Sequence, residues 1–134
     1  MITKVAFIAL PAIDPKRAGA FYKDVLGLVQ SEWDVDAWVE VDTPCGSTIA
    51  LVQDPEMAPY IALETDDIDA ELDRLTTLGV EIVHGPAPLV AGETPFCREA
   101  VIRDSEGNLL KLHQRLAPEL DGCSCGCGGC SGGC

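Results

Sequence analysis

The strongest constraint on the fold of this chain is an internal repeat. Residues 8–10 (IAL) recur as residues 61–63, and residues 46–53 (GSTIALVQ) align with residues 107–114 (GNLLKLHQ). The matched blocks keep the same order along the chain. Self-similarity of this kind indicates that one supersecondary unit occurs twice. The sequence therefore predicts a domain over residues 1–116, built from two related modules at about 1–54 and 59–116.

Each module is expected to begin with a strand and a helix. In the first module, Asp14 and Pro15 indicate a helix start, because Asp accepts hydrogen bonds from free amides and Pro fits the first turn. Gly27 indicates where that helix stops. Between these residues, apolar side chains at helical spacing predict one buried face. That face comprises Ala18, Phe21, Tyr22, Val25 and Leu26.

The second module repeats this pattern. Asp67 indicates a helix start and Gly79 its end, and the apolar residues between them share one helical face. A turn-rich segment at 104–108 (DSEGN) joins the last two strands. Strands are predicted at 4–10, 28–33, 36–42, 47–53, 59–65, 80–84, 96–103 and 108–115. The predicted class is α+β, with two tandem βαβββ modules.

Three segments carry a resemblance to a known family. They are residues 10–14 (LPAID), 20–28 (AFYKDVLGL) and 104–112 (DSEGNLLKL). With the tandem βαβββ order, the chain resembles the vicinal oxygen chelate superfamily, which includes glyoxalase I, bleomycin-resistance proteins and extradiol dioxygenases. The resemblance covers about residues 1–115. It implies an open, barrel-like cleft with the helices outside, and a homodimer.

The resemblance also implies where a cleft metal would be held. Active members use His, Gln or Glu side chains from the first and last strands of each module, and the matching positions here are Phe7, Ala50, Tyr60 and Lys111. Metal coordination requires deprotonated, oriented donor atoms. Among these four residues only Tyr60 offers a lone pair for a metal, and Lys111 carries a positive charge, so we expect no metal or other cofactor in the cleft.

Strand alternation predicts the cleft lining, because residues two apart on a strand share a face. With Lys111 facing inward, His113 faces inward too, whereas Leu110 and Leu112 face the helices. Glu99 and Lys111 are expected to form a salt bridge across neighbouring strands. Phe7 and Tyr60 are equivalent positions of the two modules. The predicted ligand-binding residues are Phe7, Trp38, Glu40, Thr48, Tyr60, Cys97, Glu99, Val101, Lys111 and His113.

Charge narrows the choice of partners. The chain has 22 acidic residues against nine Lys and Arg, a net charge of −13. Such a chain repels phosphate backbones and anionic lipid, which argues against nucleic acid and membrane surfaces as partners. The chain start lacks the basic, apolar and small-residue pattern of a secretory signal, and no apolar run is long enough to span a bilayer. A cytoplasmic location is expected.

A Cys/Gly-rich segment departs from the family pattern. Residues 117–134 are expected to be a linker and flexible tail, because the last 13 residues contain only Gly, Ser and Cys. Clustered thiolates at short spacings bind soft or borderline ions such as Zn²⁺, Cd²⁺ or Cu⁺. The alternative is a tail of idle thiols. The candidate ligands are Cys123, Cys125, Cys127, Cys130 and Cys134.

Three functions fit these features. The first is a glyoxalase-like protein that binds a small organic molecule in an aromatic-lined cleft without the usual metal. The second is a metal-independent lyase or isomerase that uses Glu40, Glu99 or His113 for acid–base chemistry. The third is a thiol-rich protein that handles soft metals or metalloids through its tail. Alternatively, the aromatic rings only fill the mouth of the barrel.

The tail hypothesis is tested by Zn²⁺ or Cd²⁺ titration under reducing conditions. Five thiols close together make chelation effectively intramolecular, and four complete a tetrahedral site. We expect the full-length chain to take up more metal at pH 7.5 than a chain ending at Asp121. This excess should fall sharply at pH 5.5, because metal must displace thiol protons. Equal uptake by the two chains would contradict the hypothesis.

Overall fold

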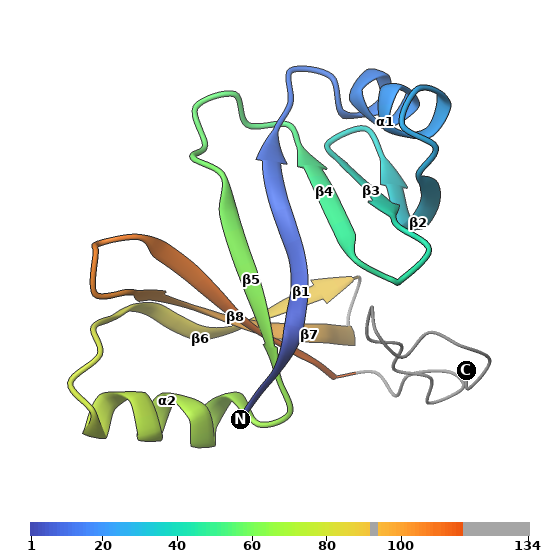
Figure 1. Cartoon of the computed structure of the whole chain (residues 1–134). Coiled ribbons are helices and arrows are strands. Elements are labelled where there is room, and N and C mark those ends of the chain that lie inside the picture. Colours follow the sequence, from blue (N-terminus) through green and yellow to red (C-terminus); the bar gives the residue numbers. More distant parts are fainter. Residues whose placement is uncertain (92–93, 117–134) are drawn as a thin grey trace. The chain divides into compact units, whose positions relative to one another are not determined.

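The computed structural model describes residues 1–91 and 94–116 (Figure 1). The linker and tail predicted over 117–134 lie outside the described residues. Within the described chain, residues 7–59 form one compact unit, and residues 1–6 together with 60–116 form another. We call them the N-terminal unit and the C-terminal unit and describe each separately.

The N-terminal unit follows the predicted order of strand, helix and three strands. Its elements are β1 (Ile2–Pro11, of which the part from Phe7 belongs here), α1 (Pro15–Asp24), β2 (Val29–Val35), β3 (Trp38–Asp42) and β4 (Thr48–Val52). The strands are ordered β2-β3-β4-β1. The pairing of β1 with β4 is parallel, and the other two pairings are antiparallel.

The C-terminal unit repeats this order. Its elements are β5 (Tyr60–Thr65), α2 (Ile68–Thr77), β6 (Ile82–Ala91), β7 (Thr94–Arg103) and β8 (Leu109–Arg115). The strands are ordered β5-β8-β7-β6, again with the first and last strands parallel and the rest antiparallel. The predicted α+β class and the twofold βαβββ order are therefore confirmed.

Strand register reproduces the sequence repeat. Ile8 pairs with Ile49 in one unit, and their repeat partners, Ile61 and Leu110, pair in the other. The glutamine that ends each repeat also has one role in both units. Gln53 Nε2 donates to the carbonyl of Ile13 at 3.5 Å, and Gln114 Nε2 donates to the carbonyl of Asp66 at 3.0 Å. Each glutamine thus ties the last strand to the residue before the helix N-cap.

The caps occur where the sequence predicts them. The Asp14 carboxylate accepts a hydrogen bond from the Arg17 amide, and Asp67 accepts one from the Ala70 amide, both at 3.1 Å. Gly27 and Gly79 follow the helices with positive φ, as a left-handed stop requires. In the 104–108 turn, Asp104 accepts bonds from the amides of residues 106 and 108.

The buried face of α1 differs from the prediction. Ala18 and Tyr22 pack on the core of Val39, Val41 and Leu51. The other three residues assigned to that face, Phe21, Val25 and Leu26, are at least half exposed. The reason is Gly19, which is buried against Val39. A Cβ at Gly19 would lie 2.7 Å from Val39 Cγ1, so the glycine sets the side of the helix that approaches the strands.

In the C-terminal unit, the alternation prediction is confirmed. Leu110 and Leu112 join Ala100 and Ile102 in the core with Ile68 and Leu72 of α2. The strand β6 runs on past the predicted 80–84 to residue 91, although it contains prolines. It is the last strand in the order and its register shifts at three places. Proline is tolerated at edges and bulges, because the missing N–H is not needed there.

Neither α1 nor α2 is long and apolar enough to cross a membrane, and these are the helices that the structure describes.

Gly19→Ala tests the close approach of α1 to β3. Over-packing a tight core contact costs about 1–3 kcal/mol, and the better helix propensity of alanine offsets about 1 kcal/mol. We expect a lower free energy of unfolding in urea, by about 1 kcal/mol. In a Val39→Ala background the blocking methyl group is absent, so Gly19→Ala should be neutral or stabilising. An equal cost in both backgrounds would refute this account.

Candidate functional site

The strand face of the C-terminal unit that points away from its core collects titratable side chains. We call it the polar face and define it by Tyr60 and Glu64 of β5, Cys97 and Glu99 of β7, and Lys111 and His113 of β8. Strand register brings them together, because Glu64 pairs with His113 on one side and Glu99 pairs with His113 on the other. The parity that buries Leu110 and Leu112 places Lys111 and His113 here.

A lysine and a carboxylate form the first pair on the polar face. Lys111 Nζ lies 3.1 Å from Glu99 Oε2, which confirms the predicted salt bridge. The same ammonium lies 4.6 Å from the centroid of the Tyr60 ring, a cation–π distance. Burial alone would lower the pKa of Lys111, but the charge of Glu99 and the contact with Tyr60 outweigh it and raise the pKa. The ammonium is held charged in a partly buried position.

A histidine and a second carboxylate form the other pair. His113 Nδ1 lies 2.6 Å from Glu64 Oε2, and both side chains are mostly buried. Glu64 Oε1 also accepts the amide of Arg115 at 3.0 Å, which fixes the carboxylate. Burial alone would lower the pKa of His113, but its interactions with Cys97 and Glu64 raise it to about 9. At neutral pH the imidazole is therefore protonated and positioned to donate a proton.

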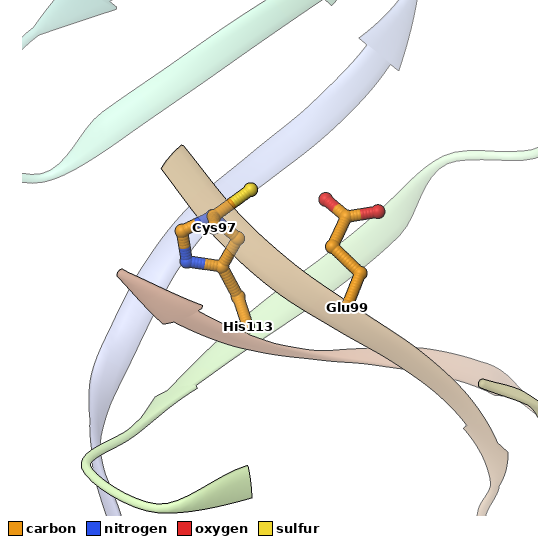
Figure 2. Close-up of side chains that lie close together, drawn as sticks. All are labelled: Cys97, Glu99 and His113. Carbon is orange, nitrogen blue, oxygen red and sulfur yellow. The ribbon is translucent and has the colours of Figure 1, made fainter. Parts of the chain in front are cut away.

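Cys97 and Glu99 lie beside this histidine. Figure 2 shows both side chains leaving β7 on the side where His113 leaves β8. One donor atom from each of these three residues lies within 4.8 Å of the other two. The cluster differs from the positions that the family resemblance implied for a metal. Phe7, Ala50 and Lys111 offer no suitable donor at those positions, so the chain does not fit the family's ligand set.

The strands of the N-terminal unit carry a different set of side chains. Trp38 Nε1 donates to Glu40 Oε2 at 2.8 Å. The ring of Trp38 packs edge-on against Phe7, with the centroids 5.7 Å apart. Thr48 Oγ1 donates to Asp42 Oδ1 at 2.6 Å. We call this set the aromatic face.

The structure places the sequence-predicted residues in two groups. Phe7, Trp38, Glu40 and Thr48 lie in the N-terminal unit, and Tyr60, Cys97, Glu99, Val101, Lys111 and His113 lie in the C-terminal unit. Val101 pairs with Lys111 in the strand register. Whether these residues bind a ligand stays a prediction.

Sequence reasoning missed Glu64, the partner of His113. Its place on the polar face was predictable from the sequence, because Glu64 lies four residues after Tyr60 on the same strand and therefore shares its face. Its contact with His113 was not predictable, because it depends on how β5 pairs with β8. The parallel register that sets Glu64 opposite His113 is not visible in the alternation of either strand alone.

The family comparison agrees with the fold. The glyoxalase/bleomycin resistance protein/dioxygenase superfamily matches residues 4–112. No curated protein matches the sequence.

Solved structures share the fold at low sequence identity. Methylmalonyl-CoA epimerase from Mycobacterium tuberculosis is 22% identical, with a TM-score of 0.70, and the match covers 87% of this chain and 90% of that one. A glyoxalase/bleomycin resistance protein/dioxygenase superfamily member from Vibrio splendidus 12B01 is 17% identical, with a TM-score of 0.65, covering 85% of this chain and 100% of that one. A variant of methylmalonyl-CoA epimerase from Streptomyces coelicolor, in complex with 2-nitronate-propionyl-CoA, is 20% identical, with a TM-score of 0.67 and coverages of 90% and 99%.

The contact between Glu64 and His113 predicts how the imidazole titrates. A nearby carboxylate stabilises the charged imidazole, and removing such a charge shifts a pKa by about 1–3 units. We expect His113 to titrate near 9 in proton NMR, and Glu64→Gln to lower that pKa by roughly 1–3 units. The chain has two histidines, so a His84→Gln variant identifies the resonance.

The same shift sets the pH dependence of stability. Because folding raises the pKa of His113 from 6.5 to about 9, its contribution is full below about pH 6.5 and is lost as pH rises through about 9. The stability advantage of wild type over Glu64→Gln should shrink across that range. The matched control is Glu81→Gln, because Glu81 is an exposed carboxylate that pairs with Arg103. This substitution should leave the pKa of His113 unchanged. Titration of His113 near 6.5 in wild type would contradict the prediction.

Proposed function

This chain belongs to the glyoxalase/bleomycin resistance protein/dioxygenase superfamily, and from that premise we propose that it binds a small organic molecule on the polar face of its C-terminal unit. The binding does not use the family's metal ligands, because the matching positions carry Phe7, Ala50, Tyr60 and Lys111.

One observation carries this proposal. Two cationic side chains, Lys111 and His113, lie side by side on β8 and are each held by a carboxylate in a partly buried position. Taking charges out of water is costly, and replacing a buried ion pair by apolar residues is often neutral or stabilising. Apolar residues in place of both partners could therefore stabilise the fold as well, whereas removing one partner alone is costly. The cluster does supply directed donors for a carboxylate or carbonyl oxygen of a ligand.

Acid–base catalysis is a second candidate, favoured by the His113–Glu64 contact. A protonated imidazole beside Glu99 provides an acid and a base on adjacent strands. The fold shared with methylmalonyl-CoA epimerase is compatible with an isomerase. A lyase or isomerase of this kind would use Glu99 and His113. The third acid–base candidate, Glu40, belongs to the N-terminal unit.

The Cys/Gly-rich tail supports a separate proposal, the binding of Zn²⁺, Cd²⁺ or Cu⁺ by its five thiols. It rests on the spacing of the cysteines alone. We also propose a homodimer, with support from membership of the superfamily. The cytoplasmic location stays a prediction from the sequence.

Native mass spectrometry of freshly purified full-length protein tests the leading proposal. We expect a bound small organic species that is lost in Lys111→Met, because the variant removes one of the two cations of the polar face. Lys16→Met is the matched control: Lys16 also forms an ion pair, with Asp34, but in the N-terminal unit. A wild-type protein without bound ligand, and without a thermal shift in a panel of small carboxylic acids, would contradict binding.

The same samples distinguish binding from catalysis. Incubation in heavy water replaces a carbon-bound hydrogen of the ligand by deuterium if Glu99 removes that proton and His113 donates a deuteron in its place. A binding protein leaves the mass of the released ligand unchanged. An increase in mass that disappears in both Glu99→Gln and His113→Gln would favour the isomerase over the binding protein.

A further inference from the structure

The cluster of Cys97, Glu99 and His113 combines three kinds of metal donor on one strand face. Cys97 and Glu99 are two residues apart on β7 and so point to the same side. His113 pairs directly with Glu99 in the β7–β8 register. Their donor atoms lie within 4.8 Å of one another (Figure 2). Zn²⁺ holds such ligands at about 2.0–2.3 Å, so small side-chain rotations bring all three to one ion.

We propose that Cys97, Glu99 and His113 form a binding site for one zinc-class divalent ion. The site lies outside the four positions that the superfamily resemblance implies, and it departs from our expectation that this face holds no metal. It also goes beyond the proposed binding of an organic ligand.

The donor types select the ion. A thiolate and an imidazole favour Zn²⁺ and similar borderline ions over Mg²⁺ and Ca²⁺, which prefer oxygen ligands. Three protein ligands leave a fourth tetrahedral position for water or another small ligand, as in zinc sites that are not purely structural. Cys97 is only 1% exposed, and the side chains of Glu99 and His113 are 16% and 14% exposed. The site is thus shielded from most of the solvent.

The surroundings of His113 match those of a zinc ligand. Metal-binding histidines commonly bond through their second nitrogen to a carboxylate that orients the ring. Here Glu64 Oε2 lies 2.6 Å from Nδ1 of His113. The coordinating atom is then Nε2, which releases its proton to the solvent when the ion binds, so that the bound imidazole is neutral. The amide of Arg115 holds the other oxygen of Glu64 at 3.0 Å, so the orienting carboxylate is itself fixed.

Charge also balances at the proposed site. With zinc bound, Cys97 is a thiolate, and Glu64 and Glu99 are carboxylates, which gives three negative charges. The two charges of the ion and the one on Lys111 compensate them. Lys111 contacts Oε2 of Glu99, and a carboxylate has a second oxygen that is able to bind an ion.

The test uses full-length protein in which Cys123, Cys125, Cys127, Cys130 and Cys134 are all replaced by serine, so that the tail contributes no thiol. This parent chain is titrated with Zn²⁺ against a chromogenic chelator, and with Co²⁺, whose bond to a thiolate gives a near-ultraviolet charge-transfer band. We expect one ion per chain, the thiolate band with Co²⁺, and no comparable uptake of Mg²⁺.

Variants of the parent chain locate the ion. Cys97→Ser should abolish the cobalt thiolate band, whereas the matched control Cys45→Ser, in the N-terminal unit, should retain it. Glu64→Gln should keep the band but weaken Zn²⁺ binding by about 10–100-fold, as removal of an orienting partner does. Glu99→Gln should also keep the band and weaken binding, which tests the site without changing the buried cysteine.

Two results would overturn the proposal. One is a folded parent chain that takes up no Zn²⁺. The other is stoichiometric Zn²⁺ uptake that is unchanged by both Cys97→Ser and Glu99→Gln, since the ion would then be held elsewhere. Circular dichroism of each variant establishes that it is folded before titration.

Discussion

Parallel pairing between the first and last strands of each unit is the contact on which the other features depend. It joins β1 to β4 and β5 to β8, segments that are separated by a helix and two strands. Closing such a long loop costs conformational entropy, and the helix offsets part of that cost by packing on the resulting strands. The pairing also fixes which side chains lie opposite one another. It places Glu64 beside His113. That contact in turn determines the protonation of the imidazole on the polar face.

Much of this arrangement is predictable from the sequence because the same signals occur twice. Asp14 and Asp67 cap helices as expected, and alternation assigns Leu110 and Leu112 to the core. Prediction fails where a tertiary contact overrides a local pattern. Gly19 turns α1 away from the face that its apolar residues suggest.

For the candidate site, alternation and the repeat predict which residues share a face, and the Lys111–Glu99 pair follows from that. The contact between Glu64 and His113 does not, because it depends on the register between strands distant in sequence. Nor does the approach of Cys97 to His113, which are diagonal neighbours across β7 and β8. Short-range patterns thus identify the members of the face, and the strand register decides which of them meet.

The hydrogen bonds of Gln53 and Gln114 distinguish the contacts that the two units share from those in which they differ. Gln53 and Gln114 make the same hydrogen bond in the two units, and Asp14 and Asp67 make the same helix cap. The contacts that both units share therefore come from residues at the ends of strands and helices. Mid-strand positions on the polar face and the aromatic face do not take part in these shared contacts. There the two units differ, since one carries rings in edge-on contact and the other carries ion pairs. One repeated backbone order thus supports two strand faces of different chemical character, because the caps and the strand-end glutamines that the units share lie away from those faces.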